Sequence, residues 1–399
     1  MIFDLFHSIS DPVIDGKNLG PVKSIASFLD QVKLAEALGM DTAWVAESHF
    51  SSEVQKKTSV ATIQNFMGEV GLNADSYQLF NLVEKNTKKI NFGTGIHNIV
   101  GGSGGPIASA ERANFLRFMN QNFVENPREI RLGVASGRFP YQNTPFGVFP
   151  RNSLEKDLWP ILKRLVFLEA LEIFLRLLKK EEVSSSKIAT REITLAQLER
   201  EMPRDAERLK SRYSFPIQVP SRYLFETLKL VPDSDIEKSF QLVLGSHDPE
   251  ALELAYQYWQ MDLFNLSFTP PEQLEKTHQK MIQLNSGTKK PWKRSRLPRT
   301  VMVFIDPDTR KAQALAHSVL DVYIDAMKGT AQVPDKTVLL QRALVGDASE
   351  IRDQLHPENP RKFHPDDRLM LWFEFNQLDN DDIKGRMKYF FKEVAEKIA

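Results

Sequence analysis

Apolar and polar positions follow one another along the chain in blocks that predict buried strands alternating with helices. Residues 2–9 form an apolar run of the kind found in a buried parallel strand, and residues 22–38 carry apolar side chains at helical spacing before Gly39. The same pattern recurs to the end of the chain. Further strands are expected at 41–46, 90–95, 131–135, 240–245, 262–266, 300–305 and 368–373.

The helices that the pattern predicts follow most of these strands, at 77–84, 106–123, after Asp248, after Pro271, and at 307–327 and 379–398. Eight strands with intervening helices are typical of an α/β fold whose parallel sheet closes on itself. We therefore expect a single eight-stranded TIM (β/α) barrel domain over residues 1–399. An open doubly wound sheet is the rival arrangement, but it would need fewer strands or a visible domain break.

Two stretches depart from this rhythm and are expected to be insertions, at 51–89 and 151–238. The second lies between strands four and five and is expected to hold two or three helices, one of them the charged segment 192–212. An excursion of this length on the catalytic side of a barrel is more often a lid or a dimer contact than a separate domain. Its most apolar part, 165–178, is interrupted by charged residues, so we expect an amphipathic helix and no membrane span.

Charge and composition narrow the classes of function. Lys and Arg number 52 and Asp and Glu number 52, so the global charge gives no reason to expect nucleic-acid or membrane partners. The chain has no cysteine, which excludes disulfides, thiolate nucleophiles and cysteine-ligated metals. The first residues, MIFDLFHSIS, lack a basic region and a long apolar run. We expect a strand there, not a signal peptide, and a cytoplasmic protein.

Titratable residues follow the predicted strand at 41–46. Glu47, Ser48 and His49 stand at its carboxyl end, where parallel α/β enzymes place their chemistry. An imidazole in that place can donate or accept a proton near neutral pH, and the alternative is a histidine that only hydrogen-bonds its own loop. Similar residues follow the next two strands, which makes an enzyme a better hypothesis than a binding module.

The strand at 90–95 ends in Thr94 and Gly95, with His97 and Asn98 after them. Gly95 is compatible with close approach of the backbone to a planar ring, and the alternative is an ordinary strand-end glycine. The glycine-rich run 101–105 lacks the lysine and the serine or threonine of a P-loop. We expect it to be a flexible loop at the mouth of a pocket.

Two places could hold an anionic group. Arg138, after the fourth strand, can reach a phosphate or a carboxylate substrate, or it forms a surface salt bridge. Gly245 and Ser246 lead into a predicted helix, and a helix N-terminus offers free N–H groups to a phosphate. The aspartate and proline that follow count partly against this site, because an aspartate repels a phosphate and a proline lacks an N–H donor.

In order and spacing, these segments resemble the bacterial luciferase-like family of flavin-dependent monooxygenases. The resemblance rests on LGMDTAWVAESHF at 38–50, KINFGTGIHN at 89–98, IRLGVASGRF at 130–139, LVLGS at 242–246 and VMVFIDPDTRKAQ at 301–313. It implies a barrel that uses reduced FMN, supplied by a separate flavin reductase, and O₂ to oxidise a small organic substrate. It also implies a homodimer and a pocket at the carboxyl ends of the strands.

From this resemblance we expect His49, His97 and Asn98 to be the catalytic residues, with Thr94 and Gly95 beside the flavin ring. The family holds a non-proline cis peptide near the position of Gly95. Aromatic residues close to the predicted strand ends are the candidate pocket walls, namely Phe6, Trp44 and Phe139.

The flavin phosphate is expected to lie near Gly245 and Ser246, and near Ser136 and Arg138. Ser136 stands where luciferases have a phosphate-binding arginine, and Ser48 stands where they have the first of two histidines, their catalytic acid or base. A serine does not titrate near neutral pH. Another group therefore takes that role, or the reaction needs none.

Three hypotheses compete. A flavin-dependent monooxygenase leads, with a deazaflavin as the alternative cofactor that some relatives use. A flavin-binding partner protein with altered catalysis is the second, because Ser48, Ser136 and Gly105 replace functional side chains of the family. The third is a metal-dependent barrel hydrolase, although no His-x-His or His-Glu-x-x-His pair is present. Its candidate ligands are His7, His49, His97 and His247.

Overall fold

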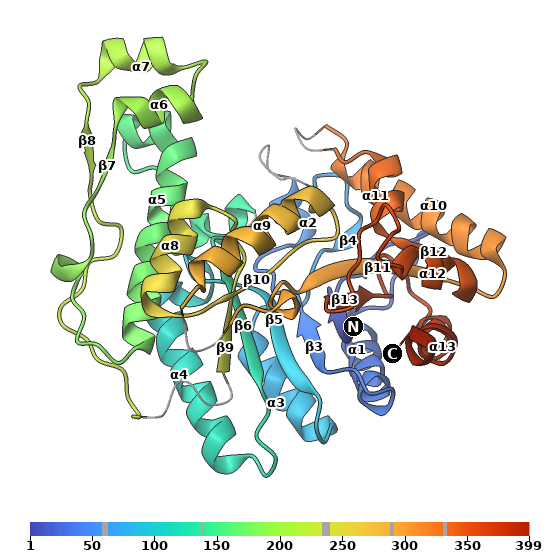
Figure 1. Cartoon of the computed structure of the whole chain (residues 1–399). Helices are drawn as coiled ribbons and strands as arrows, with labels where there is room; N and C mark the ends of the chain where they lie inside the picture. Colours follow the sequence, from blue (N-terminus) through green and yellow to red (C-terminus); the bar gives the residue numbers. More distant parts are fainter. Residues whose placement is uncertain (58–62, 138, 234–239, 288–290, 330–332, 399) are drawn as a thin grey trace.

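The computed structural model describes residues 1–57, 63–137, 139–233, 240–287, 291–329 and 333–398. Within these residues the centre of the molecule is a nine-stranded sheet with parallel neighbours, in the order β10-β9-β6-β5-β3-β1-β13-β11-β12 (Figure 1). Its strands are β1 (Ile2–His7), β3 (Thr42–Val45), β5 (Asn91–Asn98), β6 (Ile130–Ala135), β9 (Phe240–Leu244), β10 (Asp262–Leu263), β11 (Arg299–Ile305), β12 (Leu344–Gly346) and β13 (Arg368–Trp372).

The helices lie in the connections between these strands and after the last strand (Figure 1). They are α1 (Pro21–Ala37), α2 (Glu53–Lys56), α3 (Ser76–Asn86), α4 (Gly105–Phe123), α5 (Ser153–Leu178), α6 (Leu195–Glu201), α7 (Ala206–Arg212), α8 (Pro249–Tyr258), α9 (Pro271–Leu284), α10 (Thr309–Met327), α11 (Lys336–Arg342), α12 (Ala348–Leu355), α13 (Asn380–Phe390) and α14 (Glu396–Ile398). No described helix is long and apolar enough to cross a membrane.

The β10 end of the sheet contacts β11, near the other end of the sheet, at one point. Asn265, just after β10, forms an isolated parallel bridge with Arg299, the first residue of β11. The Asn265 N–H donates to the Pro298 carbonyl at 2.8 Å, and the Asn265 carbonyl accepts from the Thr300 N–H at 2.9 Å. The parallel α/β sheet predicted from the sequence is confirmed. A ring closed by full strand pairing is not formed by the described residues, so the closed barrel stays a prediction.

The hydrophobic pattern missed β12. This strand pairs with the carboxyl half of β11, with Val303 beside Leu344 and Ile305 beside Gly346. It is three residues long and is flanked by the short helices α11 and α12. A run this short carries too little periodicity to be recognised in the sequence.

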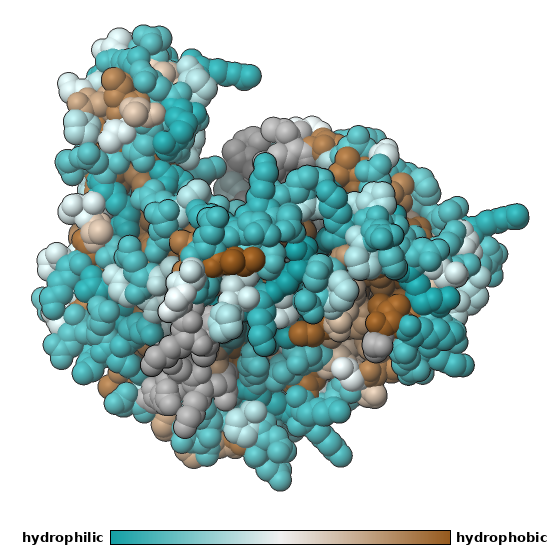
Figure 2. Space-filling view, viewed as in Figure 1, coloured by the Kyte–Doolittle hydropathy of each residue, from teal (hydrophilic) through white to brown (hydrophobic). Residues whose placement is uncertain are grey.

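The stretch 151–238 holds the long helix α5 and then a projection that we call the arm, residues 179–233. The arm contains the antiparallel pair β7 (Arg191–Ile193) and β8 (Ile217–Val219), with α6 and α7 at its tip (Figure 1). The helix expected at 192–212 is divided in two, because the proline at 203 cannot continue the hydrogen bonding of α6. The face seen in Figure 2 is mostly hydrophilic, with a small hydrophobic patch on the arm.

The expectation that 165–178 is amphipathic is wrong, because side chains are buried all round this part of α5. It is enclosed by α4 on one side and α8 on another. Its charged residues are paired inside the protein. Glu169 accepts hydrogen bonds from the N–H of Arg222 at 3.0 Å, and Glu172 accepts from Arg191 at 2.9 Å. Paired carboxylates are tolerated in a buried helix, so the charges did not mark a solvated face.

The other stretch, 51–89, holds α2, α3 and the strand β4 (Gly68–Glu69), which pairs antiparallel with β2 (Asp11–Pro12). The buried Lys56 fixes this connection, because its Nζ donates to the Phe66 carbonyl at 2.7 Å. The segment thus lies folded against the chain that follows β1.

Candidate active site

The carboxyl ends of β3 and β5 place one glutamate between two histidines. His49 Nε2 lies 3.0 Å from Glu47 Oε1, and His97 Nδ1 lies 2.9 Å from Glu47 Oε2. All three residues are buried. Because β3 and β5 are parallel, with Val45 beside Thr94, the chain leaves both strands at the same edge of the sheet. The sequence predicted that these residues lie at strand ends, and the structure brings them together.

Glu47 is held in its ionised form by the two histidines. Burial alone would raise the pKa of this carboxyl, but the charge of His97 and the hydrogen bonds from both imidazoles outweigh it, so the pKa lies well below its ordinary value. Ser76 Oγ donates a further hydrogen bond to Oε2 at 2.9 Å. A buried carboxylate with these partners orients both rings.

His97 has both ring nitrogens engaged. Nδ1 contacts Glu47, and Nε2 lies 3.1 Å from Ser109 Oγ on α4. The Tyr77 ring packs on the imidazole with 5.2 Å between centroids, and burial, followed by the Glu47 charge, raises the pKa of Tyr77. Only 1 % of the His97 side chain is exposed. This geometry fits a positioning role for His97 behind the strand ends.

His49 has one nitrogen engaged, because Nε2 pairs with Glu47 and no described residue hydrogen-bonds Nδ1. Gly102 packs against the same ring, since a Cβ there would lie 2.8 Å from His49 Cδ2. The Phe146 ring meets the imidazole edge to face, with 6.0 Å between centroids. An imidazole held at one nitrogen and free at the other is suited to general acid or base catalysis.

Asn98 joins three segments at the end of β5. Its Nδ2 donates to the Gln142 carbonyl at 3.1 Å and to Asn143 Oδ1 at 2.9 Å, and its Oδ1 accepts from the Val100 N–H at 3.0 Å. These bonds connect β5 to the loop after β6. In this structure the side chain of Asn98 therefore orders the loops around the site.

The glycine-rich run 101–105 packs over the site and leads directly into α4. Gly102 is buried, and a Cβ at this position would lie 3.0 Å from Asn98 Nδ2 as well as against His49. From the arm, the Tyr223 hydroxyl donates to the Val100 carbonyl at 2.6 Å. Glycine at 102 is thus needed for close packing over His49, and the run forms no phosphate cradle.

Thr94 lies within the ladder that joins β5 to β6. Its Oγ1 accepts from the Gly133 N–H at 2.9 Å and donates to the Gly133 carbonyl at 3.0 Å. The strand register shifts between Thr94 and His97, so the hydroxyl fills the place of a missing backbone pair. The bulge turns the end of β5 and places His97 beside Glu47.

Gly95 follows, and its peptide bond to Ile96 is cis, where the family resemblance implied such a bond. A Cβ on Gly95 would lie 2.9 Å from Phe6 and 3.1 Å from Phe264. Phe6, Phe264 and Trp44 belong to one apolar cluster inside the sheet. These aromatic rings border the backbone at the ends of β1 and β5, and their role as pocket walls stays a prediction.

Phe139, the third expected wall residue, lies in a different cluster, where it stacks on Tyr141 with 5.2 Å between centroids. Ser136 lies after β6, and its carbonyl accepts a hydrogen bond from Asn143 Nδ2 at 2.8 Å. Its half-buried hydroxyl has no hydrogen-bond partner among the described residues. Arg138 lies outside the described residues.

Gly245 and Ser246 join β9 to α8, as predicted. Ser246 Oγ accepts from the Asp248 N–H at 3.2 Å, which leaves the hydroxyl proton free to donate. Asp248 is the N-cap of α8, accepting from the Ala251 N–H at 3.0 Å, and a proline opens the helix. Arg164 of α5 lies 3.8 Å from Asp248 and also pairs with two glutamates. The donors that remain for a phosphate are few.

Of the four candidate metal ligands, His49 and His97 share Glu47, whereas His7 and His247 have other partners. His7 accepts from the Ile9 N–H at 2.9 Å, and burial lowers its pKa although Glu374 opposes the shift. His247 lies 3.4 Å from Thr277 Oγ1, and burial likewise lowers its pKa. Among the described residues, no group of three His, Asp or Glu side chains is arranged to hold a metal ion.

Sequence reasoning missed three residues that complete the site. Ser76, Tyr77 and Ser109 come from α3 and α4 and contact Glu47 or His97. They are buried polar or amphipathic positions on the inner faces of helices, where periodicity predicts apolar residues. A serine on the buried face of a helix that follows a strand with polar ends is the signal that could have revealed them.

A sequence model of the family described as luciferase-like monooxygenase matches residues 2–364, whereas no curated protein matches the chain. Monooxygenase RslO1 from Streptomyces bottropensis is 15% identical, covers 100% of each chain and gives a TM-score of 0.68. The oxygenating constituent of 3,6-diketocamphane monooxygenase from Pseudomonas putida, in complex with FMN, is 15% identical over 100% of this chain and 99% of that chain, with a TM-score of 0.62.

An F420-dependent secondary alcohol dehydrogenase, in complex with an F420-acetone adduct, is also similar. It is 15% identical, covers 99% of this chain and 98% of that chain, and gives a TM-score of 0.54. At these identities the solved structures show a common fold only. The sequence model, in contrast, matches residues 2–364, which is well over half of the chain. The chain therefore belongs to the luciferase-like monooxygenase family.

Proposed function

We propose that this protein is a flavin-dependent monooxygenase that oxidises a small organic substrate, with His49 as its acid or base. The observation that carries the proposal is the pairing of His49 Nε2 with Glu47 at 3.0 Å, which leaves Nδ1 without a described partner. His49 thus takes over the role of the family histidine that is replaced by Ser48 in this chain. Glu47 fixes the tautomer and the orientation of the ring, and His97 supports Glu47 from the other side.

The residues present fit a flavin ring better than they fit its phosphate. Gly95, bordered by Phe6 and Phe264, gives a bare backbone beside aromatic rings at the strand ends. For the phosphate, Ser246 offers a hydroxyl proton, but Asp248 places a carboxylate close by. We propose that Thr94, Gly95, Gly245 and Ser246 border the flavin. When bound, a reduced flavin would supply the electrons that activate O₂.

FMN is the proposed cofactor, because one of the similar structures holds FMN and the donor set here suits a small phosphate at most. A similar structure that holds F420 keeps the deazaflavin as the alternative. We propose that a separate flavin reductase supplies the reduced cofactor, as the family resemblance implies. Protein groups then exclude water around the reacting centre and hold or move one proton at His49.

We also propose that the chain is a single barrel domain that forms a homodimer. The outer face of α4 supports this, because three large apolar side chains are exposed along it: Phe115 by 54%, Met119 by 37% and Phe123 by 68%. In a dimer with a two-fold axis beside α4, the apolar row of one subunit packs against the same row of the second subunit. This one surface is therefore enough to form the interface.

The experiment that tests the proposed function is anaerobic titration of the purified protein with reduced FMN, followed by stopped-flow mixing with O₂. A monooxygenase binds the flavin at micromolar concentrations and changes the course of its reoxidation relative to free flavin. If the flavin binds but its reoxidation is unchanged, the chain is the flavin-binding partner considered above. If neither FMN nor F420 binds at micromolar concentrations, the proposal is wrong.

A further inference from the structure

A cavity lies at the opposite end of the sheet from His49. Its volume is about 790 Å³, and its walls include Arg131, Asp262 and Arg368. These residues stand at the amino ends of their strands, as the second residue of β6 and the first residues of β10 and β13. The cavity is therefore separate from the candidate active site, which lies at the carboxyl ends.

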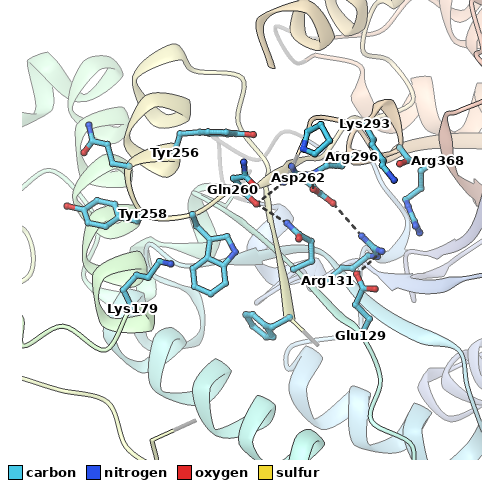
Figure 3. A pocket seen from close by; sticks show the side chains of 16 residues that line it. Glu129, Arg131, Lys179, Tyr256, Tyr258, Gln260, Asp262, Lys293, Arg296 and Arg368 are labelled. Carbon is cyan, nitrogen blue, oxygen red and sulfur yellow. Dashed lines mark hydrogen bonds and ion pairs between the residues drawn. The ribbon is translucent and has the colours of Figure 1, made fainter. Parts of the chain in front are cut away.

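One side of the cavity is cationic. Figure 3 shows Lys293, Arg296 and Arg368 together there, with Arg131 and Asp262 beside them. Asp262 is shared, since its Oδ1 lies 2.7 Å from Arg296 and its Oδ2 lies 3.4 Å from Arg131. Two arginines thus use one carboxylate, and the exposed Lys293 forms no ion pair with a described residue.

Arg368 is buried but has donors to spare. Its hydrogen bonds to described residues, at 2.9 Å and 2.6 Å to Asp4 and Asp41, all come from Nη1. The whole residue is only 5% exposed, yet its side chain lines the cavity. Nη2 forms no hydrogen bond with a described residue, so it is available to a group inside the cavity. A guanidinium presents its N–H donors in a planar fork that matches a carboxylate.

The other side of the cavity is aromatic. Figure 3 shows Tyr256, Tyr258 and Lys179 there, apart from the arginine group, and Trp259 completes this wall. Lys179 Nζ lies 4.6 Å from the centre of the Trp259 ring. Tyr256 is held in place by Asn285, whose Nδ2 donates to the tyrosine hydroxyl at 3.0 Å. Rigid aromatic walls of this kind favour a planar ring over a flexible chain.

The charges around the cavity are unequal. The lining holds five cations, Arg131, Lys179, Lys293, Arg296 and Arg368, and two carboxylates, Glu129 and Asp262. Counting Asp4 and Asp41 as the partners of Arg368 brings the carboxylates to four. Lys293, which forms no ion pair with a described residue, is a cation that an anionic ligand can meet.

We propose that this cavity is a binding site for a planar aromatic carboxylate, with the ring against Tyr256 and the carboxylate between Arg368 and Lys293. The volume is ample for two fused rings, and the two chemical halves of the cavity match the two halves of such a ligand. Residues at the amino end of a barrel more often serve stability, and an ion-pair network that only ties the strands together is the competing explanation. The two explanations differ in what Lys293 does, because it has no described ion pair.

The test is isothermal titration of the full-length protein with 2-naphthoate, with three comparison compounds. They are 2-naphthalenemethanol, which has the ring without the charge, acetate, which has the charge without the ring, and 2-naphthyl phosphate. We expect 2-naphthoate to bind with a Kd below about 1 mM and at least about tenfold more tightly than the alcohol or acetate. Tighter binding of the phosphate than of the carboxylate would replace the carboxylate in this proposal by a phosphate monoester and overturn the class stated here.

The variant Lys293→Glu tests the position of the anion, and Lys276→Glu, at an exposed lysine of α9 outside the cavity, is its matched control. We expect the first to weaken binding of 2-naphthoate at least about tenfold and the second less than about twofold. Neither variant should change flavin binding, since the cavity lies at the other end of the sheet. Equal effects of the two variants, or no saturable binding to the wild type at 5 mM or about that level, would overturn the proposal.

Discussion

Glu47 Oε2 lies 2.9 Å from Nδ1 of His97, while the other oxygen of the same carboxylate lies 3.0 Å from Nε2 of His49. One buried charge therefore controls two imidazoles that come from different strands. Of the two rings, His49 keeps a nitrogen for chemistry. This relationship leaves His49 for acid or base catalysis and His97 for positioning.

Replacement of His49 by asparagine should lower kcat about 10²-fold or more, because the proposed acid or base is lost. Flavin affinity should stay within about threefold, since the side chain is not a proposed phosphate ligand. Ser48→Ala is the matched control on the preceding residue and should retain kcat within about twofold, because a serine does not titrate there. Steady-state kinetics and flavin titration of both variants measure this. Equal losses in the two variants would remove His49 from its proposed role.

Glu47→Gln should destabilise the fold by about 3 kcal/mol at pH 7, because it breaks a buried, hydrogen-bonded charge pair. The wild-type contribution depends on pH. The folded pKa of Glu47 lies below its ordinary value of 4.5, so the stability it adds is present above that pH and is lost as the pH falls towards the folded pKa.

Urea unfolding of wild type and Glu47→Gln at pH 7, 5 and 4 measures this effect. The difference in free energy of unfolding between the two should shrink as the pH falls below about 4.5. Glu253→Gln, at an exposed glutamate on α8, is the control and should differ little from wild type at each pH. A difference between wild type and Glu47→Gln that is constant over this range would contradict the assigned ionisation.

Gly102→Ala should impair catalysis more than stability. The added Cβ would lie 2.8 Å from His49 Cδ2 and 3.0 Å from Asn98 Nδ2, so the imidazole or the loop must move. Because small displacements of a catalytic group are costly, we expect kcat to fall about tenfold to hundredfold. Gly385→Ala on α13 is the control, since a Cβ there meets open space. Thermal unfolding and kinetics of both variants distinguish displacement from unfolding.

Asp248→Asn should strengthen binding of FMN about threefold to tenfold. Asparagine keeps the N-cap of α8 and removes a negative charge next to the proposed phosphate contact at Ser246. Riboflavin, which has no phosphate, should bind both proteins equally. Asp335→Asn, at the N-cap of α11, is the matched control and should change neither affinity. If FMN and riboflavin respond alike to Asp248→Asn, the phosphate does not lie at this helix.

Phe115→Asp should dissociate the proposed homodimer, because it places a charge in the exposed apolar row of α4. Val22→Asp is the control, on a residue of α1 that is 83% exposed and lies outside that row. Light scattering coupled to gel filtration gives the mass of each variant. A monomeric wild type, or a dimer that survives Phe115→Asp, would contradict the interface proposed here.

The sequence predicted where Glu47, His49 and His97 lie, because their strands end in polar residues. The motifs around Glu47 and His97 could be recognised because apolar runs stop abruptly there, and parallel strands bring such ends to one edge. Ser109 and Tyr77 were missed because their contact with His97 depends on which face of each helix packs against which strand. That pairing is tertiary information, which the spacing of residues along one helix does not carry.

Two errors in the fold have the same origin. The hydrophobic pattern takes Glu169 and Glu172 as marks of a solvated face, but in the structure the arm supplies their partners and buries them. The strand β12 is too short for its alternation to be seen, and its pairing with β11 decides its conformation. In both places, contacts distant in sequence override the local pattern.

The lone contact between Asn265 and Arg299 also has a dynamic consequence. The other neighbouring strands of the described sheet are joined along two or more residue pairs, whereas β10 and β11 can separate after losing the bonds around Asn265. Local opening should begin there. The amides beside Phe264 should therefore exchange with deuterium before those of neighbouring strands with longer backbone pairing. The hydrogen bonds of Asn265 thus set how easily the sheet opens at this edge.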